Sequence, residues 1–235
     1  MKIISWNTRG LGSRKKQRVV KDFLRLENPD VVMIKKTKKM ECYRRFVGSI
    51  WMVRNKDWAI LPACEASGGI LIIWDSNKLH SEEVVIGSFS VSVKFALDGC
   101  GPLWLSAVYG PNSPLLRKDF WVELLDIFGL SFPLWCISGD FNVIRRISKK
   151  MGGSSLSSST KNFDDFIREC ELLDPPLHNT PFTWSNMQES PVCKRLDRFL
   201  YSNEWELSFP QSLQEVLPRR TSNHWPIVLE TNLFK

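Results

Sequence analysis

The side chains best suited to chemistry in this sequence are polar residues at the ends of apolar runs. In chain order they are Asn7, Tyr109, Asp140, Asn142, Asn223 and His224. A carboxylate or an imidazole can accept and hold a proton, and amides or a phenol can donate hydrogen bonds to an anion. Strand ends in stacked sheets can converge on one rim, so we predict that these residues share one site.

Each of these residues also has a purely structural explanation. Asn7 could be a turn residue, residues 139–142 have the composition of a turn, and His224 could be a hydrogen-bonded histidine of the core. The prediction of a site therefore depends on the whole set and on its order along the chain.

The elements that must position these residues are short apolar strands separated by helices. Strands are predicted at residues 2–6, 31–34, 70–74, 84–86, 91–95, 103–109, 135–138, 182–184, 196–201 and 226–230. Amphipathic helices are predicted at residues 14–26, 115–129 and 161–170. This pattern predicts one α+β domain over residues 1–235. The low-complexity segment 151–160 is interpreted as a surface loop, because both its flanks carry parts of one pattern.

Composition excludes several classes of protein. Apolar residues make up 43% and charged residues 24%, which is typical of a globular chain and not of a disordered or collagen-like one. No apolar run approaches the roughly 18 residues of a membrane helix, and the N-terminus lacks a signal peptide. The absence of a long apolar run leads us to expect no membrane association. The six cysteines form no CxxC pair, so we expect reduced, packed thiols and an intracellular location.

The positive charge is concentrated at the N-terminus. Residues 1–50 contain 14 Lys and Arg against 4 Asp and Glu, whereas the remainder contains 18 against 21. The excess lies mainly in two runs, residues 14–18 and 35–39. A basic face of this kind suits a polyanion such as nucleic acid, although a solvated helix face without a partner explains it equally well.

Eight short motifs then identify a resemblance. They are Ser5-Trp6-Asn7, the Thr37 segment, Gly68-Gly69 before Trp74-Asp75, Val108-Tyr109-Gly110-Pro111, Gly139-Asp140-Phe141-Asn142, Phe182-Thr183-Trp184-Ser185-Asn186, Arg195-Leu196-Asp197-Arg198-Phe199 and Ser222-Asn223-His224-Trp225-Pro226. In this order they resemble the endonuclease/exonuclease/phosphatase superfamily, which includes AP endonucleases and DNase I. The motif sequences are most similar to those of endonuclease domains of plant LINE-type, non-LTR retrotransposons. The resemblance extends from residue 2 to about residue 230.

The resemblance implies a fold and a reaction. The fold would be an α+β, four-layer αββα sandwich: two packed mixed β-sheets flanked by helices, DNase I-like, with the site at one rim. The reaction would be hydrolysis of a DNA phosphodiester assisted by Mg²⁺ or Mn²⁺. We expect a monomer that contacts mainly the DNA backbone, and a DNA substrate would imply a nuclear location.

The resemblance also assigns roles. Asn7 and Asp140 would help to hold the metal and its water, and Asp140 would orient or deprotonate the attacking water. Asn142, Tyr109 and His224 would bond phosphate oxygens, and Asp197 would hold the imidazole of His224. The residues expected to contact nucleic acid are Arg14, Lys15, Lys38, Trp184, Asn186 and Arg195.

Two departures fall on the implied metal site. Where the family has a metal-binding glutamate in a QETK motif, this chain has Lys36, and where it has the aspartate of SDH, this chain has Asn223. Lysine has no acceptor atom and cannot bind Mg²⁺, which prefers oxygen ligands. We therefore expect a reduced metal affinity and a weak or inactive enzyme.

Three alternatives stay open beside an impaired endonuclease. The first is a catalytically dead nucleic-acid-binding remnant of the same fold, which would bind DNA without a metal. The second is a small-molecule phosphatase of the same superfamily, disfavoured by the motifs at residues 183–186 and 195–200. The third is a decaying transposon copy without a selected function.

Overall fold

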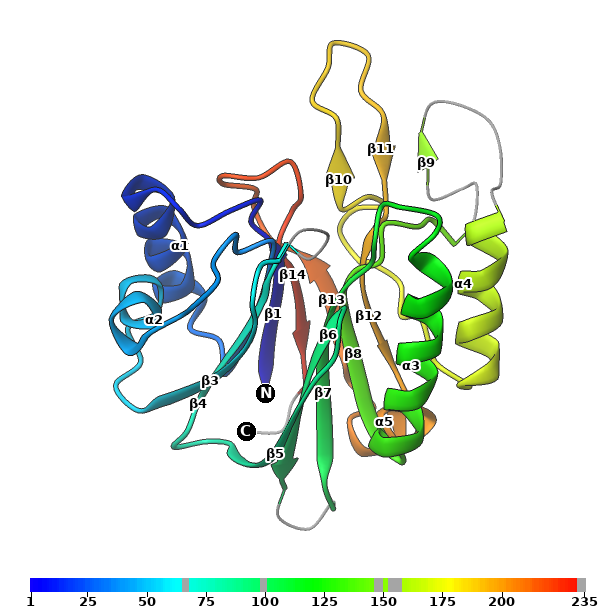
Figure 1. Ribbon diagram of the computed structural model, residues 1–235, viewed down its shortest axis with the longest axis horizontal. Coiled ribbons are helices and arrows are strands. Elements are labelled where there is room, and N and C mark those ends of the chain that lie inside the picture. The colour runs from blue at the N-terminus through cyan, green and yellow to red at the C-terminus, as the bar shows by residue number, and fades with distance from the viewer. Residues whose placement is uncertain (65–67, 98–100, 146–149, 152–157, 232–235) are drawn as a thin grey trace.

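Two β-sheets pack face to face in the computed structural model, which describes residues 1–64, 68–97, 101–145, 150–151 and 158–231 (Figure 1). The six-stranded sheet has the order β13 (Leu213–Val216), β14 (Ile227–Glu230), β1 (Lys2–Asn7), β2 (Val31–Lys35), β4 (Ile70–Asp75), β3 (Lys56–Leu61). The five-stranded sheet has the order β12 (Asp197–Tyr201), β8 (Leu134–Asp140), β7 (Leu103–Tyr109), β6 (Ser90–Ala96), β5 (His80–Ile86).

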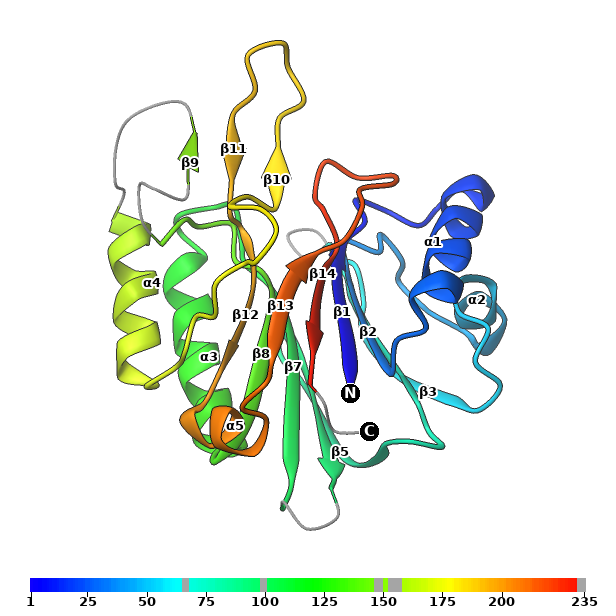
Figure 2. The same ribbon diagram turned by 180° about the vertical axis from the view of Figure 1, so that it is seen from behind.

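Helices cover the outer face of each sheet. Helices α1 (Arg14–Glu27) and α2 (Arg44–Ile50) lie on the six-stranded sheet, and α3 (Arg117–Ser131) and α4 (Ser158–Glu169) lie on the five-stranded sheet (Figures 1 and 2). The short α5 (Asn203–Ser208) closes the end opposite the rim that carries the site. The four-layer αββα sandwich predicted from the sequence is therefore confirmed. No helix in the described residues is both long and apolar enough to cross a bilayer.

Three apolar layers hold the four structural layers together. The central layer lies between the sheets, where Ile3, Met33 and Ile72 face Leu105 and Phe199. A second layer lies under α3 and α4, and a third under α1 and α2. The runs VVMIK and ILIIWD are buried on both faces because each of these strands contacts a sheet on one side and helices on the other.

Local sequence signals fix the ends of α1. The Ser13 hydroxyl accepts a hydrogen bond from the Lys16 backbone nitrogen at 3.2 Å, which caps the N-terminus. Asn28 ends the helix in the left-handed conformation with φ 45°, and Pro29 follows. The helix matches the prediction within one residue. By contrast, the predicted helix at 161–170 begins earlier, at Ser158, and residues 152–157 of the low-complexity segment lie outside the described residues.

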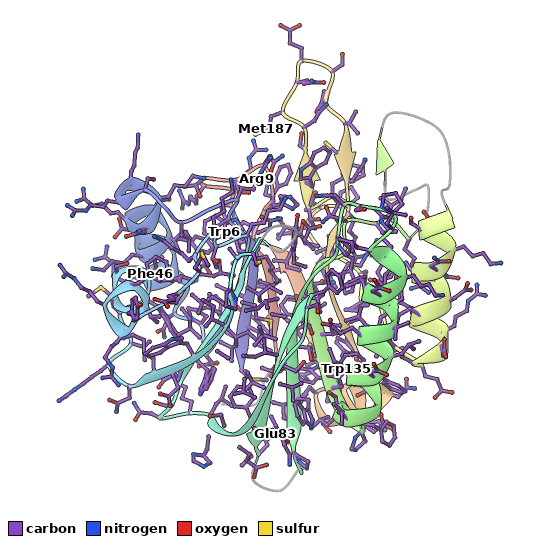
Figure 3. All side chains as sticks on the ribbon, viewed as in Figure 1. Trp6, Arg9, Phe46, Glu83, Trp135 and Met187 are labelled. Atoms are coloured by element: carbon purple, nitrogen blue, oxygen red, sulfur yellow. The ribbon has the colours of Figure 1, made fainter. Side chains whose placement is uncertain are left out.

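A third, small sheet rises above the rim of the sandwich. It contains β10 (Trp184–Ser185), β11 (Cys193–Lys194) and β9 (Lys150–Met151), and the β10–β11 hairpin projects from the molecule (Figures 1 and 2). Figure 3 labels Met187 in the loop of this hairpin. An isolated β-bridge between Trp184 and His224 joins the hairpin to the segment before β14, so the hairpin stands at the rim of the sandwich.

Candidate active site

Strand direction brings the predicted site residues to one rim. Strands β7 and β8 run parallel and end in register at Tyr109 and Asp140. Strand β12 runs antiparallel to β8, so its first residue, Asp197, pairs with Asp140. Asn7 ends β1, and β14 is antiparallel to β1, so His224, just before β14, lies at the same end. The convergence predicted from strand ends follows from this topology.

A hydrogen-bonded chain of four buried side chains forms the centre of the site. The Asp197 carboxylate Oδ2 lies 2.8 Å from Nδ1 of His224, and Nε2 of the same imidazole lies 3.6 Å from Oδ2 of Asp140. Asn7 donates from Nδ2 to Oδ2 of Asp140 at 2.7 Å, and the same nitrogen lies 3.4 Å from Nε2 of His224. All four residues are at most 4% exposed. The imidazole is thus held between two carboxylates.

The two carboxylates determine the charge of the imidazole. Burial alone would lower the pKa of His224, but the charges of Asp197 and Asp140 and the hydrogen bond from Asp197 outweigh it, so the pKa is raised above its usual value. The pKa of Asp140 is also raised, chiefly because the carboxyl is buried, although His224 opposes this. The site therefore favours a charged imidazole beside a carboxyl group with an increased proton affinity.

Tyr109 and Asn142 lie at the edge of this chain. The Tyr109 hydroxyl accepts a hydrogen bond from Asn112 at 3.4 Å. Asn142 adopts a left-handed conformation with φ 53°, and its backbone nitrogen donates to Oδ1 of Asp140 at 3.0 Å. Its side-chain amide donates to the Gly110 carbonyl at 2.6 Å. A Cβ atom on Gly110 would lie 2.4 Å from the Phe141 carbonyl oxygen, so this close approach of the two rim loops requires glycine.

Lys36 occupies the rim where the resemblance implied a metal-binding glutamate. Its Nζ lies 4.9 Å from the centre of the Tyr109 ring. The positive charge of Lys36 repels a charged imidazole and so acts to lower the pKa of His224. Two backbone hydrogen bonds fix the loop: Thr37 donates to the Gly69 carbonyl and Lys38 to the Gly68 carbonyl. The ammonium is therefore held next to the site.

The donor set for a cation is partly present. One ligand atom each from Asp140, Asp197 and His224 lie within 4.8 Å of one another, a set that could hold a metal ion while the imidazole is neutral. Asn223, the neighbour of His224 in the chain, has a buried amide oxygen, Oδ1, without a hydrogen-bond partner among the described residues. Carboxylate and amide oxygens suit Mg²⁺. The nearby Lys36 ammonium opposes a divalent cation, so the residues fit a weakly held ion.

Lys35 is a buried residue of the site that the sequence analysis missed. It was counted in the basic run 35–39, yet its side chain is fully buried, and Nζ donates to the Ser5 hydroxyl. Burial lowers its pKa to about 7, although Asp197 and Asp140 raise it. Val31 and Met33 point into the layer between the sheets. The two-residue period of a strand extends this face to Lys35. Because the residues before it are apolar on both faces, the sequence does not show which face points inward.

The residues predicted to contact nucleic acid have different environments. Arg14, Lys15 and Lys38 are exposed. The Trp184 ring is half-buried, and its centre lies 6.5 Å from that of His224. The Asn186 amide organises the hairpin turn, because Oδ1 accepts from the Val192 backbone nitrogen at 2.9 Å and Nδ2 donates to Gln188.

The expectation for Arg195 was wrong. Its side chain is 2% exposed, and Nη2 donates to Oδ1 of Asp174 at 3.0 Å and to the Pro175 carbonyl at 2.6 Å. Arg198 and Arg145 bind the same carboxylate. Arg195 therefore belongs to a buried ion cluster under the rim and cannot reach a nucleic acid while this cluster is intact.

Comparison with solved structures establishes the fold. The chain is similar to the AP endonuclease LMAP of Leishmania major, with a TM-score of 0.76, 15% identity and coverage of 97% of this chain and 86% of that one. It is similar to the endonuclease domain of TRAS1, a telomere-specific non-LTR retrotransposon, with a TM-score of 0.72, 12% identity and coverage of 100% and 99%. For the catalytic domain of Xenopus laevis APE2 the TM-score is 0.73, with 16% identity and coverage of 98% and 91%.

No protein-family model and no curated protein sequence matches the chain. At identities this low the structural likeness defines the fold alone. The chain has the DNase I-like αββα fold, and its function must be argued from its own site.

Proposed function

We propose that this chain is a phosphodiester hydrolase that acts on DNA and whose cation site is weakened by Lys36 and Asn223. The observation that carries the proposal is the buried chain from Asp197 through His224 to Asp140 and Asn7, with contacts of 2.8, 3.6 and 2.7 Å. Such a set places a positive charge, a proton acceptor and a hydrogen-bond donor around one point on the rim. These are the groups that hydrolysis of a phosphate diester requires.

Each residue of this chain has a distinct role in the proposal. Asp197 fixes the imidazole through Nδ1, so that Nε2 of charged His224 donates to a phosphate oxygen. Asp140, with its raised pKa, orients the attacking water and accepts a proton from it. Asn7 holds the Asp140 carboxylate in place, and Tyr109 and Asn142 bond further phosphate oxygens.

A divalent cation, Mg²⁺ or Mn²⁺, would be held by Asp140, to which Asn7 donates a hydrogen bond, and by the unpartnered amide oxygen of Asn223. When bound, it would stabilise the negative charge that develops on the phosphate. The Lys36 ammonium would repel the ion and supply part of the same positive charge itself. We therefore propose that this site binds the cation more weakly than a site with carboxylates in place of Lys36 and Asn223 would.

The proposed partner is DNA, bound mainly through its backbone by a monomer. The exposed basic residues Arg14, Lys15 and Lys38 support this interpretation, as do the neighbours of the same fold that are named endonucleases. The sequences of the eight motifs support descent from a plant LINE-type retrotransposon. A DNA substrate implies action in the nucleus.

Lys36 specifically favours a second candidate function, a DNA-binding module without catalysis. An ammonium fixed 4.9 Å from the Tyr109 ring would strengthen binding of a phosphate while it excludes a metal. This module would retain Trp184, Lys38 and the basic face.

Nicking of supercoiled plasmid during a Mg²⁺ titration, with DNA binding measured in EDTA, separates the two candidates. The hydrolase proposal predicts slow nicking that rises with Mg²⁺ and is absent from the His224→Ala variant. Arg168→Ala is the control, since this exposed side chain lies in the last turn of α4, which ends away from the rim (Figure 1). Binding in EDTA without nicking at any Mg²⁺ concentration would refute the hydrolase proposal and support the binding module.

A further inference from the structure

A basic groove outside the candidate active site lies between α1 and α2. It has a volume of about 1000 Å³, which is large for a small-molecule pocket. Its lining residues are Arg14, Gln17, Arg18, Lys21, Asp22, Arg25, Tyr43, Arg45, Phe46, Ser49 and Met52. None of them belongs to the candidate active site. Figures 1 and 2 show α1 and α2 side by side on the outer layer, and Figure 3 labels Phe46 there and Trp6 near the rim end of β1.

Cationic side chains line one wall of the groove in a row. Arg14, Arg18, Lys21 and Arg25 recur at helical spacing on α1, which at 1.5 Å per residue gives a stripe about 16 Å long. Arg45 adds a fifth positive charge from α2. Asp22 is the one acidic lining residue, and its carboxylate lies 3.9 Å from the Arg25 guanidinium. Guanidinium groups bind phosphates in two-point contacts, so the row suits a chain of phosphates.

The other wall carries exposed apolar side chains. Tyr43 is 67% exposed and Met52 59%, and Phe46 lies between α1 and α2 with Lys39 Nζ 5.2 Å from its ring centre. An exposed aromatic ring beside cations is the usual arrangement for stacking a nucleobase whose phosphate is neutralised nearby. A duplex would keep its bases stacked internally and could not use this ring.

The uncharged side chains Gln17 and Ser49 of the groove are already engaged in hydrogen bonds within the protein. Gln17 donates from Nε2 to the Leu11 carbonyl at 2.8 Å, and the Ser49 hydroxyl donates to the Phe46 carbonyl at 2.6 Å. With the cationic side chains bound to phosphates, the groove offers ring faces and few other groups that could read base edges. Recognition would be independent of sequence.

We infer that the groove between α1 and α2 binds single-stranded DNA, with phosphates on the α1 row and a base stacked on Tyr43. The choice of DNA over RNA rests on the proposed function, whereas the preference for a single strand rests on the groove itself. The site is separate from the rim, so the chain would hold an unpaired strand while the rim engages a phosphodiester.

Fluorescence anisotropy of a short labelled oligothymidylate, measured in EDTA, tests this inference without any cleavage. The Arg18→Glu, Arg45→Glu variant should bind at least about tenfold more weakly than the unmodified chain, because each lost phosphate contact weakens binding. Arg44→Glu, Arg54→Glu is the matched control: it makes the same charge change on α2 and on the segment that follows it, at exposed residues that do not line the groove. Circular dichroism verifies that both variants are folded. Equal losses in both variants would overturn the inference.

The aromatic wall is tested separately. Tyr43→Ala should weaken oligothymidylate binding about tenfold, the size expected for one stacked base, and should leave binding of an abasic oligonucleotide of equal length unchanged. Asp22→Asn should tighten both, because it removes the acidic lining residue. Abasic DNA or polyglutamate bound as tightly as oligothymidylate would overturn the inference, the latter in favour of an acidic protein partner. Tighter binding of oligouridylate or of duplex DNA would also overturn it. Since nicking is not measured, failure here leaves the proposed function standing.

Discussion

Replacing Asp197 by asparagine should lower the pKa of His224. The Asp197 carboxylate contacts Nδ1 of the imidazole at 2.8 Å, and both side chains are almost fully buried. Asparagine keeps the shape and a hydrogen bond but removes the charge. The raised pKa of His224 depends on the charges of Asp197 and Asp140, so the substitution removes the first charge and leaves the second.

The magnitude follows from the contact. Two unit charges about 4 Å apart interact by about 4 kcal/mol at an effective dielectric constant of about 20. The hydrogen bond that asparagine retains, and the Asp140 carboxylate at 3.6 Å, preserve part of the raised affinity for the proton. The pKa of His224 should therefore decrease, and the charged imidazole should lose at most about 4 kcal/mol of stabilisation.

Imidazole resonances followed by NMR across a pH titration measure this directly. The chain contains three histidines, and the other two, His80 and His178, are exposed and serve as internal references. The raised pKa of folded His224 stabilises the fold below the pKa of an unfolded histidine, about 6.5, and this stabilisation is lost as pH rises through the folded pKa. The variant should therefore lose more stability below pH 6.5 than at higher pH. A His224 pKa that stays the same or rises in the variant would refute the electrostatic account of the site.

Three further predictions concern the interior and α1. Because the pKa of buried Lys35 is lowered to about 7, the unfolded state binds one more proton than the folded state between pH 7 and 10, and the stability of the unmodified chain should rise over this range by at most about 5 kcal/mol. Lys35→Met should abolish this rise, measured by urea unfolding at both pH values. Asp174→Asn should destabilise the fold by about 3–5 kcal/mol in urea unfolding, since it leaves Arg195 and Arg198 without their counter-ion; a loss under 1 kcal/mol would contradict the buried cluster. Ser13→Ala should cost about 1 kcal/mol in the same assay by removing the cap of α1, whereas exposed Ser88→Ala should cost nothing.

Strand ends were the part of the site that the sequence predicted best. An apolar run that stops at a polar residue locates both a strand and its rim, as for β8 and Asp140 or β1 and Asn7. The same logic failed for short elements. Helix α5 has six residues and β13 has four, which is too short for periodicity to stand out. Edge strand β3, KDWAIL, carries two charges and mixed exposure, and was not predicted.

The environment of charged residues could not be predicted from their neighbours in the sequence. Lys35 and Lys36 are adjacent, but Lys35 lies on the inner face of β2 and Lys36 follows the end of the strand. Arg195 appeared to be a DNA contact because it sits in a motif beside the site, yet Asp174, distant in the sequence, binds it in the interior. Burial of a charge depends on such long-range partners.

The most direct test of the central claim is plasmid nicking by the Lys36→Glu, Asn223→Asp variant beside the unmodified chain, across the same Mg²⁺ titration. The account predicts that the variant nicks at lower Mg²⁺ and at least about a hundredfold faster, because oxygen ligands replace an ammonium and an amide at a site that is otherwise assembled. Adding His224→Ala to the variant should abolish the gain. Equal activity of variant and unmodified chain, with both folded, would contradict the claim that these two residues weaken the site.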